Sequence, residues 1–348
     1  MPGSEAPASL ARVRTLVEPA LRRAVAVLSD EIRPAVEYHL GWVDEFGKEL
    51  ANDGGKGIRP ALAVLSAEVV GAPAVIGVPG AVAVELVHNF SLIHDDVIDG
   101  DTERRHRATV WTLFGVGAAI VAGDALLTLG QQVLLNPSIA LGSSADVDLA
   151  AASRAARLLA DSTAEMNAGQ ALDLDFERQR SVSYEDCLVM EAGKTGALLS
   201  CAAAIGAVFA DAEQGSVDAL ARFGAQLGLA FQAVDDLLGI WGDPATTGKP
   251  TFADLRQHKK TLPVTAAIAA GGPGAEELMT LLAETELSES QVTRAAELVD
   301  ALGGRQRATD EARTSMEVAL EALESAATNP AATDDLRELA HFIVDRQF

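Results

Sequence analysis

Apolar residues recur every three or four positions along most of this chain, and strand-like alternation of apolar and polar residues is nearly absent. Such spacing is typical of amphipathic helices that pack against one another. Hydrophobic residues make up 49% of the chain but aromatic residues only 4%, so the core must be mainly aliphatic. Ala and Leu, which favour helices, are abundant. The sequence therefore predicts an all-α protein.

We expect the helices to be joined by turns within one domain. No repeat or long linker divides the chain, and the breaks near 135–144 and 271–274 are typical of turns. The prediction is a single all-α domain of ten or more helices over 1–348, with an N-terminal helix in 1–30, a core over about 54–263 and C-terminal helices over about 264–346. The expected helices cover about 8–29, 35–50, 60–71, 79–99, 117–135, 145–178, 184–210, 215–241, 262–270, 274–284, 289–302, 305–327 and 332–346.

The chain carries 27 basic and 50 acidic residues, a formal net charge of −23. A nucleic-acid surface or a polybasic membrane contact needs positive charge, so the composition argues against both. The two cysteines, Cys187 and Cys201, lack metal-ligand spacing and are expected to be buried thiols. There is no secretion-signal pattern and no uncharged apolar run of about 18 residues. We expect a cytoplasmic protein without a membrane span.

Two acidic clusters end apolar stretches that lie far apart in the sequence. The first consists of Asp95, Asp96 and Asp99, and the second of Asp235 and Asp236. On a helix, Asp95 and Asp99 project from one face about 6 Å apart, where like charges repel each other. Binding of Mg²⁺ would reverse that repulsion, because this cation prefers carboxylate oxygens and shares them with substrate phosphates. The clusters therefore predict a magnesium site between two helix ends.

Basic residues accompany both clusters and are suited to binding the same phosphates. Arg104 and Arg105 follow the first cluster, whereas Lys249 and Lys259 follow the second. Together with the carboxylates, these cations predict an enzyme that handles a diphosphate.

Further cations lie elsewhere in the chain. Lys56 and Arg59 precede an expected helix N-terminus, a position that favours anions. Lys194 and Thr195 lie in Gly-Lys-Thr-Gly, which lacks the upstream glycine and preceding strand of a phosphate-binding P-loop. His88 lies two turns before the first acidic cluster, on a helix whose other faces are apolar.

In combination, six stretches of the chain resemble the trans-isoprenyl diphosphate synthases, which are head-to-tail prenyltransferases. They are GGKGIRP (54–60), ELVHNFSLIHDDVIDGDTERR (85–105), GKTG (193–196), FQAVDDLLGIWGD (231–243), GKP (248–250) and DLRQHKKTLP (254–263). The resemblance implies an isoprenoid synthase bundle around a central cavity. It also implies three Mg²⁺ ions, isopentenyl diphosphate and an allylic diphosphate as substrates, and a homodimer.

The resemblance further implies roles for single residues. Asp95, Asp96 and Asp99 would form the first acidic motif and Asp235 and Asp236 would begin the second, with Asp95, Asp99 and Asp235 as magnesium ligands. The residues expected at the allylic diphosphate are Arg104, Lys194, Lys249 and Lys259. Those expected at the diphosphate of isopentenyl diphosphate are Lys56, Arg59, His88 and Arg105. Thr195 and Gln232 would lie near the reacting carbons, where their dipoles stabilise an allylic cation.

The mechanism that follows is an ionisation. Magnesium and the cations neutralise the leaving diphosphate, so the allylic C–O bond breaks at tolerable cost. The double bond of isopentenyl diphosphate, held in contact, attacks the carbocation. The departing diphosphate is then a plausible base for the final proton.

One position departs from the resemblance, because Gly239 stands where a third aspartate is expected. The first aspartate is the expected ligand, so activity should survive.

The segment also loosely resembles the metal motif of class I terpene cyclases, with Asp235, Gly239 and Asp243 at i, i+4 and i+8. A cyclase needs no site for isopentenyl diphosphate, whereas all the cations of such a site are present. A non-catalytic regulatory subunit is the remote alternative, and it would predict more damaged motifs.

Product length depends on the residues just before the first acidic cluster. Phe90 lies five residues before Asp95, about 7.5 Å along the helix axis, and Ser91 is its small neighbour. The resemblance implies that a bulky residue here forms the cavity floor, as in short-chain geranylgeranyl diphosphate synthases. Simple core packing of Phe90 is the competing interpretation. We expect geranylgeranyl diphosphate as the product, with farnesyl or geranylfarnesyl diphosphate as alternatives.

Overall fold

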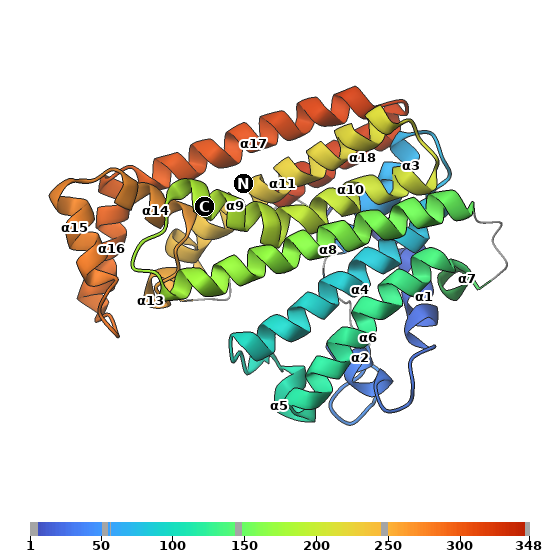
Figure 1. The fold of residues 1–348 in the computed structure, drawn as a ribbon, viewed down its shortest axis with the longest axis horizontal. Helices are drawn as coiled ribbons and strands as arrows, with labels where there is room; N and C mark the ends of the chain where they lie inside the picture. Colours follow the sequence, from blue (N-terminus) through green and yellow to red (C-terminus); the bar gives the residue numbers. More distant parts are fainter. Residues whose placement is uncertain (1–5, 51–54, 56, 143–147, 245–249, 345–348) are drawn as a thin grey trace.

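The computed structural model describes residues 6–50, 55, 57–142, 148–244 and 250–344, and these form α-helices almost throughout (Figure 1). The first half contains α1 (Ala8–Val25), α2 (Arg33–His39), α3 (Ile58–Val69), α4 (Ala74–Ile98), α5 (Val110–Phe114), α6 (Val116–Leu135), α7 (Ser138–Leu141) and α8 (Leu149–Arg178). The second half contains α9 (Tyr184–Glu191), η1 (Ala192–Gly196), α10 (Ala197–Phe209), α11 (Gln214–Trp241), α13 (Ala253–Arg256), α14 (Leu262–Ala269), α15 (Gly272–Leu281), α16 (Glu289–Ala301), α17 (Gly304–Ala326) and α18 (Pro330–Val344). The all-α prediction is confirmed, whereas the assignment of 1–348 to one domain stays a prediction.

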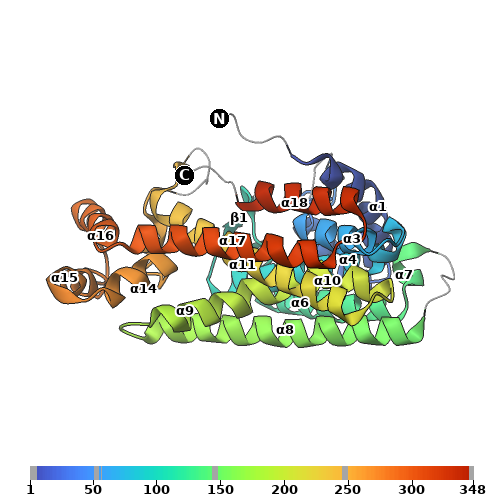
Figure 2. The same cartoon turned by 90° about the horizontal axis from the view of Figure 1, so that it is seen from above.

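The two helices that carry the acidic clusters lie on either side of a third. α10 packs against both α4 and α11, and α8 runs along it as well. α15 and α16 lie at one end of the molecule, and α1, α3 and α7 lie at the other (Figure 1 and Figure 2). The main core is aliphatic as expected, with Leu62, Leu86 and Leu126 fully buried. The bundle thus packs helices from both halves of the sequence around one central helix.

Several expected boundaries were wrong for local reasons. The helix expected over 35–50 ends at His39, because Gly41 adopts a positive φ and the chain turns into a short bridge between Val43 and Glu49. The expected helix over 79–99 begins at Ala74, with Pro79 accommodated inside it. The expected helix over 184–210 is interrupted by the π-helical turn η1.

A two-stranded hairpin follows the first acidic cluster and was not expected. β1 (Glu103–Arg104) pairs with β2 (Arg107–Ala108), and Arg104 is directly opposite Arg107. Arg105 and His106 form its turn with φ values of 52° and 59°. Arg104 therefore lies on a strand and Arg105 in the turn, although they are adjacent in sequence.

Among the residues that the structure describes, three helical stretches are long and apolar enough to cross a membrane by length and composition alone: Ala74–Ile98, Val116–Leu135 and Tyr184–Phe209. In the first and third, 72% and 67% of the most apolar window is buried within the protein, so their apolar residues mainly build the core. α6 differs, because only 44% of its window is buried. The absence of a membrane span stays a prediction.

Candidate active site

The first acidic cluster lies at the C-terminal end of α4. Asp95 is half-buried and Asp99 caps the helix, donating its backbone N–H to the Asp95 carbonyl oxygen over 2.8 Å. Burial raises the pKa of Asp95 to about 6, since a carboxylate loses hydration there, while the charge of Lys194 opposes the shift. Burial also raises the pKa of Asp99. Because these carboxylates are partly desolvated, a bound cation would stabilise their charged form.

The second acidic cluster lies near the end of α11. Asp235 is half-buried, whereas Asp236 is buried and accepts hydrogen bonds from Gln232 Nε2 (3.1 Å) and from the backbone N–H of Leu262 (2.8 Å). Burial raises the pKa of Asp236 to about 7. Asp236 is thus anchored to the start of α14, and both Asp235 and Asp236 line a cavity.

The Gly-Lys-Thr-Gly stretch forms most of η1, a π-helical turn of the kind often found at functional sites. Lys194 Nζ lies 2.5 Å from Asp173 Oδ2 on α8, and Thr195 Oγ1 donates to Gln232 Oε1 over 3.0 Å. α8 can approach this turn because Gly169 has no side chain: a Cβ atom there would lie 2.2 Å from the Lys194 backbone nitrogen. The turn thereby connects α8 to α11.

Two adjoining cavities share Lys194 and Thr195 and extend from them toward the two acidic clusters. The first has about 790 Å³ of space and the second about 580 Å³, open mouths included. Predicted residues that line the first are Arg59, His88, Phe90, Ser91 and Asp95, and those that line the second are Gln232, Asp235, Asp236 and Lys259. Residues that are far apart in the sequence therefore form one continuous site.

The predicted site for isopentenyl diphosphate is only partly gathered in the first cavity. Arg59 Nη1 donates to His88 Nε2 over 3.3 Å. Burial above all, and then the charge of Arg59, lowers the pKa of His88 well below its usual value, so the imidazole is neutral and accepts this bond. Arg105 lines neighbouring pockets instead. Lys56 and Lys249, also predicted to bind diphosphate, lie outside the described residues.

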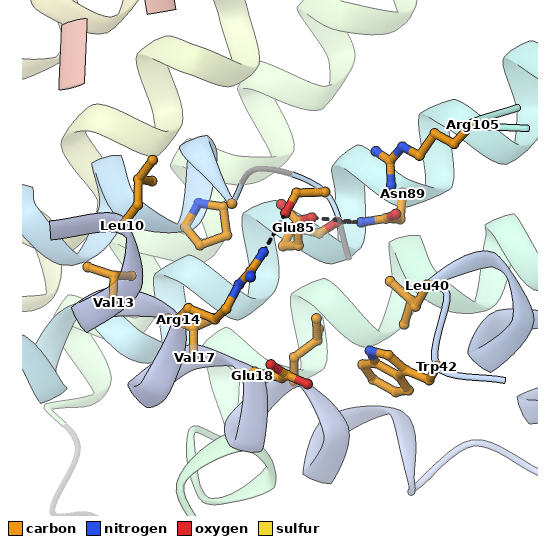
Figure 3. Close-up of a pocket in the computed structure, with 14 residues that line it drawn as sticks. Leu10, Val13, Arg14, Val17, Glu18, Leu40, Trp42, Glu85, Asn89 and Arg105 are labelled. Atoms are coloured by element: carbon orange, nitrogen blue, oxygen red, sulfur yellow. Dashed lines mark hydrogen bonds between the residues drawn. The ribbon is translucent and has the colours of Figure 1, made fainter. Parts of the chain in front are cut away.

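Arg105 also borders a pocket that the sequence gave no reason to expect, between α1 and α4 (Figure 3). Leu10 and Val13 form part of its apolar wall, while Glu85 and Asn89 line its polar side. Asn89 Nδ2 donates to Glu85 Oε1 over 3.1 Å and to the Glu85 carbonyl oxygen over 2.8 Å. These bonds turn both polar groups toward each other beside the arginine.

The carboxylates suit magnesium in chemistry but do not form a preassembled cage. Among the described residues, no group of three or more His, Cys, Asp or Glu side chains is placed to hold a metal by itself. Asp95 and Asp235 come instead from separate helices that border a lysine-lined space. Magnesium is usually bound by one or two carboxylates together with substrate phosphates and water, and these residues fit that mode.

The cyclase interpretation finds little support in this geometry. Gly239 has no side chain to offer a metal, and Asp243 is exposed rather than among the residues that line the cavity beside Asp235.

Asp254 and Lys260 were quoted within the stretch 254–263 but given no role, and both line the second cavity. For these two residues, the available signal was their position near Lys259 in the sequence. Asp173, which pairs with Lys194, lies outside the quoted stretches. Glu191, which was not named, also lines that cavity and is 3% exposed. Its place three residues before Lys194 was too weak a signal, because helix packing decides which way it points.

An all-α bundle with two acidic helix ends beside a shared lysine-lined cavity defines the class of the trans-isoprenyl diphosphate synthases. The comparison with known families agrees, since the polyprenyl synthetase family matches residues 41–299. The chain belongs to the polyprenyl synthetase family.

Individual relatives span nearly the whole chain. A (2E,6E)-farnesyl diphosphate synthase of Mycobacterium tuberculosis is 44% identical over 95% of this chain and 91% of its own length. A geranylgeranyl diphosphate synthase of the same organism is 41% identical over 100% of this chain and 96% of its own length. The crystal structure of a polyprenyl synthetase from Streptomyces coelicolor superposes with a TM-score of 0.89 at 49% identity, covering 98% of this chain and 100% of that one.

Proposed function

We propose that this chain is a Mg²⁺-dependent head-to-tail prenyltransferase that condenses isopentenyl diphosphate with an allylic diphosphate. One observation carries the proposal: Lys194 and Thr195 line both the cavity beside Asp95 and the cavity beside Asp235. A diphosphate bound at Lys194 therefore lies between carboxylates from two helices. That arrangement of charge suits a substrate whose diphosphate must leave.

The chain's own residues bind the leaving group and face the reacting carbons. Asp95, Asp99 and Asp235 would hold magnesium together with the substrate phosphates, and the ion would supply positive charge that eases cleavage of the allylic C–O bond. Lys194 and Lys259 bind the same diphosphate by charge. The Thr195 hydroxyl and the Gln232 carbonyl are hydrogen-bonded to each other at the cavity wall, where their dipoles stabilise positive charge on carbon.

Isopentenyl diphosphate is held in the first cavity by Arg59 and His88 rather than by Lys194. Arg59 and neutral His88 bind its diphosphate as a linked pair, and Arg105 adds charge from the hairpin. The double bond then lies within contact of the allylic carbon, and the departing diphosphate accepts the final proton. Binding both substrates in one continuous space converts the condensation into an effectively intramolecular step.

We further propose geranylgeranyl diphosphate as the product. Phe90 is 7% exposed and lines the first cavity next to Ser91, and its ring packs edge-on against His94 with centroids 4.8 Å apart. A fixed aromatic ring at this depth suits the floor of a short-chain product cavity. Farnesyl diphosphate is the second candidate, because the relative at 44% identity is a farnesyl diphosphate synthase.

The enzyme is proposed to act in the cytoplasm as a homodimer. The surface of α5 and the start of α6 exposes five large hydrophobic residues close together in sequence: Leu113, Phe114, Val116, Ile120 and Val121. Large exposed apolar patches mark interaction surfaces. A second copy packed on this face would bury the apolar helix that is least covered within one chain.

Release of diphosphate tests the proposed reaction. The purified protein is expected to release diphosphate only when Mg²⁺, isopentenyl diphosphate and an allylic diphosphate are present together. Release from the allylic substrate alone would support the cyclase instead, and no release under any combination would support the regulatory subunit.

A further inference from the structure

The carboxylate of Asp254 fills the space beside Gly239, where the second acidic cluster lacks a third aspartate. A Cβ atom at residue 239 would lie 1.9 Å from Asp254 Oδ2 and 2.5 Å from its Cγ. A side chain at residue 239 is therefore incompatible with the present position of the Asp254 carboxylate. The position of the Asp254 carboxylate therefore depends on glycine at residue 239.

This arrangement brings the Asp254 carboxylate onto the face of α11 that carries Asp235. Residues 235 and 239 are one helical turn apart, so their Cβ positions lie about 5–6 Å from each other on one face. The Asp254 carboxylate overlaps the second of these positions. Accordingly, Asp254 and Asp235 line the same cavity, which also contains Lys194 and Lys259.

Local backbone contacts fix Asp254 in this position. It lies in the short helix α13 and its side chain is almost completely buried. The Phe252 N–H donates to the Ile240 carbonyl oxygen over 3.0 Å, which ties the start of this segment to α11. The Lys259 N–H donates to the Asp254 carbonyl oxygen over 3.0 Å. The backbones of Asp254 and Lys259, whose side chains line the same cavity, are thus tied together.

We propose that Asp254 supplies from α13 the carboxylate that the second acidic cluster lacks at Gly239, and that it joins Asp235 in binding the magnesium–diphosphate complex. This inference rests on the proposed function. A carboxylate is the hard oxygen donor that magnesium prefers, whether it contacts the ion or a water bound to it. Gly239 is then a permissive residue rather than a defect of the cluster.

The test uses binding rather than turnover as its readout. Thermal unfolding of the full chain is followed with inorganic diphosphate while Mg²⁺ is titrated. Asp254→Asn keeps the shape of the side chain but removes its charge, so the Mg²⁺ concentration for half-maximal stabilisation should rise about 10- to 100-fold. An unchanged Mg²⁺ dependence would overturn the inference.

A reciprocal exchange provides a second, independent test. Gly239→Asp alone should weaken Mg²⁺-dependent stabilisation, because its side chain displaces the Asp254 carboxylate. Adding Asp254→Ala to Gly239→Asp should restore binding, because the carboxylate then comes from residue 239. A double variant that binds no better than Gly239→Asp would contradict the inference. Gly215→Ala is the matched control on the same helix, where a Cβ atom meets nothing within 4 Å, and should bind like the wild type.

The two proposals fail in different ways. If the wild type condenses its substrates but the variants keep its Mg²⁺ dependence, only the role of Asp254 is lost. If the wild type shows neither condensation nor Mg²⁺-dependent stabilisation, the proposed function and this inference are overturned together.

Discussion

Arg104 Nε donates a hydrogen bond to Asp96 Oδ1 over 2.7 Å, and the Asp96 side chain is almost completely buried. The middle aspartate of the first acidic cluster thus holds a cation of the hairpin. Asp96 borders the pocket around Arg104 and Arg105, whereas Asp95 lines the first cavity of the active site. Neighbouring carboxylates therefore serve different partners.

Asp96→Ala should impair binding of the allylic diphosphate more than binding of isopentenyl diphosphate. The variant leaves Arg104 without its hydrogen-bond partner. A charged hydrogen bond contributes about 1.5–3 kcal/mol, and its loss corresponds to roughly a 10- to 100-fold fall in kcat/KM. Steady-state kinetics with each substrate varied in turn would measure this. Equal losses for both substrates would contradict the specific role.

Lys194 is expected to be the cation whose loss costs most, because it lines both cavities. Lys194→Met removes its charge from the diphosphate and leaves Asp173 unpaired. We expect kcat/KM for the allylic substrate to fall at least about 100-fold, the upper end for a charged hydrogen bond. Lys48→Met, at an exposed site, serves as the control. If the Lys194 variant had the same kinetics as this control, Lys194 would not bind the allylic diphosphate.

Phe90→Ala should lengthen the product. Removing the ring opens the floor of the first cavity, so one or more further isopentenyl units can be added before release. The folded state should also lose about 3 kcal/mol of stability, as is common for buried Phe→Ala changes. Mass spectrometry of the dephosphorylated products measures chain length, with the exposed Phe46→Ala as control. An unchanged product distribution would assign Phe90 to core packing alone.

Ile120→Glu should dissociate the proposed dimer, because it places a charge in the middle of the exposed apolar surface of α5 and α6. Light scattering after size-exclusion chromatography would report the mass. Val27→Glu alters an exposed residue just beyond α1 and should leave the mass unchanged. A wild-type chain that is monomeric at micromolar concentration would remove the dimer from the account.

Glu191→Gln should stabilise the protein increasingly as the pH rises. Burial above all, and then the charge of Asp236, raises the pKa of Glu191 well above its usual value, with Cys187 and Glu311 as its other titratable neighbours. The folded chain therefore keeps a proton that the unfolded chain releases above about pH 4.3. Stability falls with pH by up to about 1.4 kcal/mol per unit in that window, and Gln abolishes this loss.

Urea unfolding at pH 5 and pH 8 measures the effect of Glu191→Gln. The variant should gain more over the wild type at pH 8 than at pH 5. Glu289→Gln changes an exposed carboxylate that is paired with Arg256 and should show no such gain. An equal difference at both pH values would show that Glu191 is ionised in the folded protein.

The sequence predicted the fold class and several of the residues that line the two cavities, because both depend on regular patterns. Helical periodicity located α11 within one residue at its start, and the spacing of Asp95 and Asp99 predicted their common helix. The side chains of Phe90 and Gln232 line these cavities, and the roles that the resemblance implies for them stay predictions.

The remaining features depend on tertiary contacts that have no sequence period. The π-helical turn at Lys194 follows from the close approach of α8 at Gly169, which is distant in sequence. The placement of Arg104 on a strand and Arg105 in a turn depends on a hairpin whose strands have two residues each, too short to produce a strand pattern. The Asp254 carboxylate packs into the space beside Gly239, and this contact between two helices cannot be read from the sequence.

Product analysis is the sharpest test of the proposed prenyltransferase activity. The purified protein is incubated with Mg²⁺, isopentenyl diphosphate and dimethylallyl, geranyl or farnesyl diphosphate, and dephosphorylated products are identified by mass spectrometry. We expect linear all-trans alcohols ending at geranylgeraniol, formed only when isopentenyl diphosphate is present. A cyclic hydrocarbon from an allylic diphosphate alone, or the absence of any product, would contradict it.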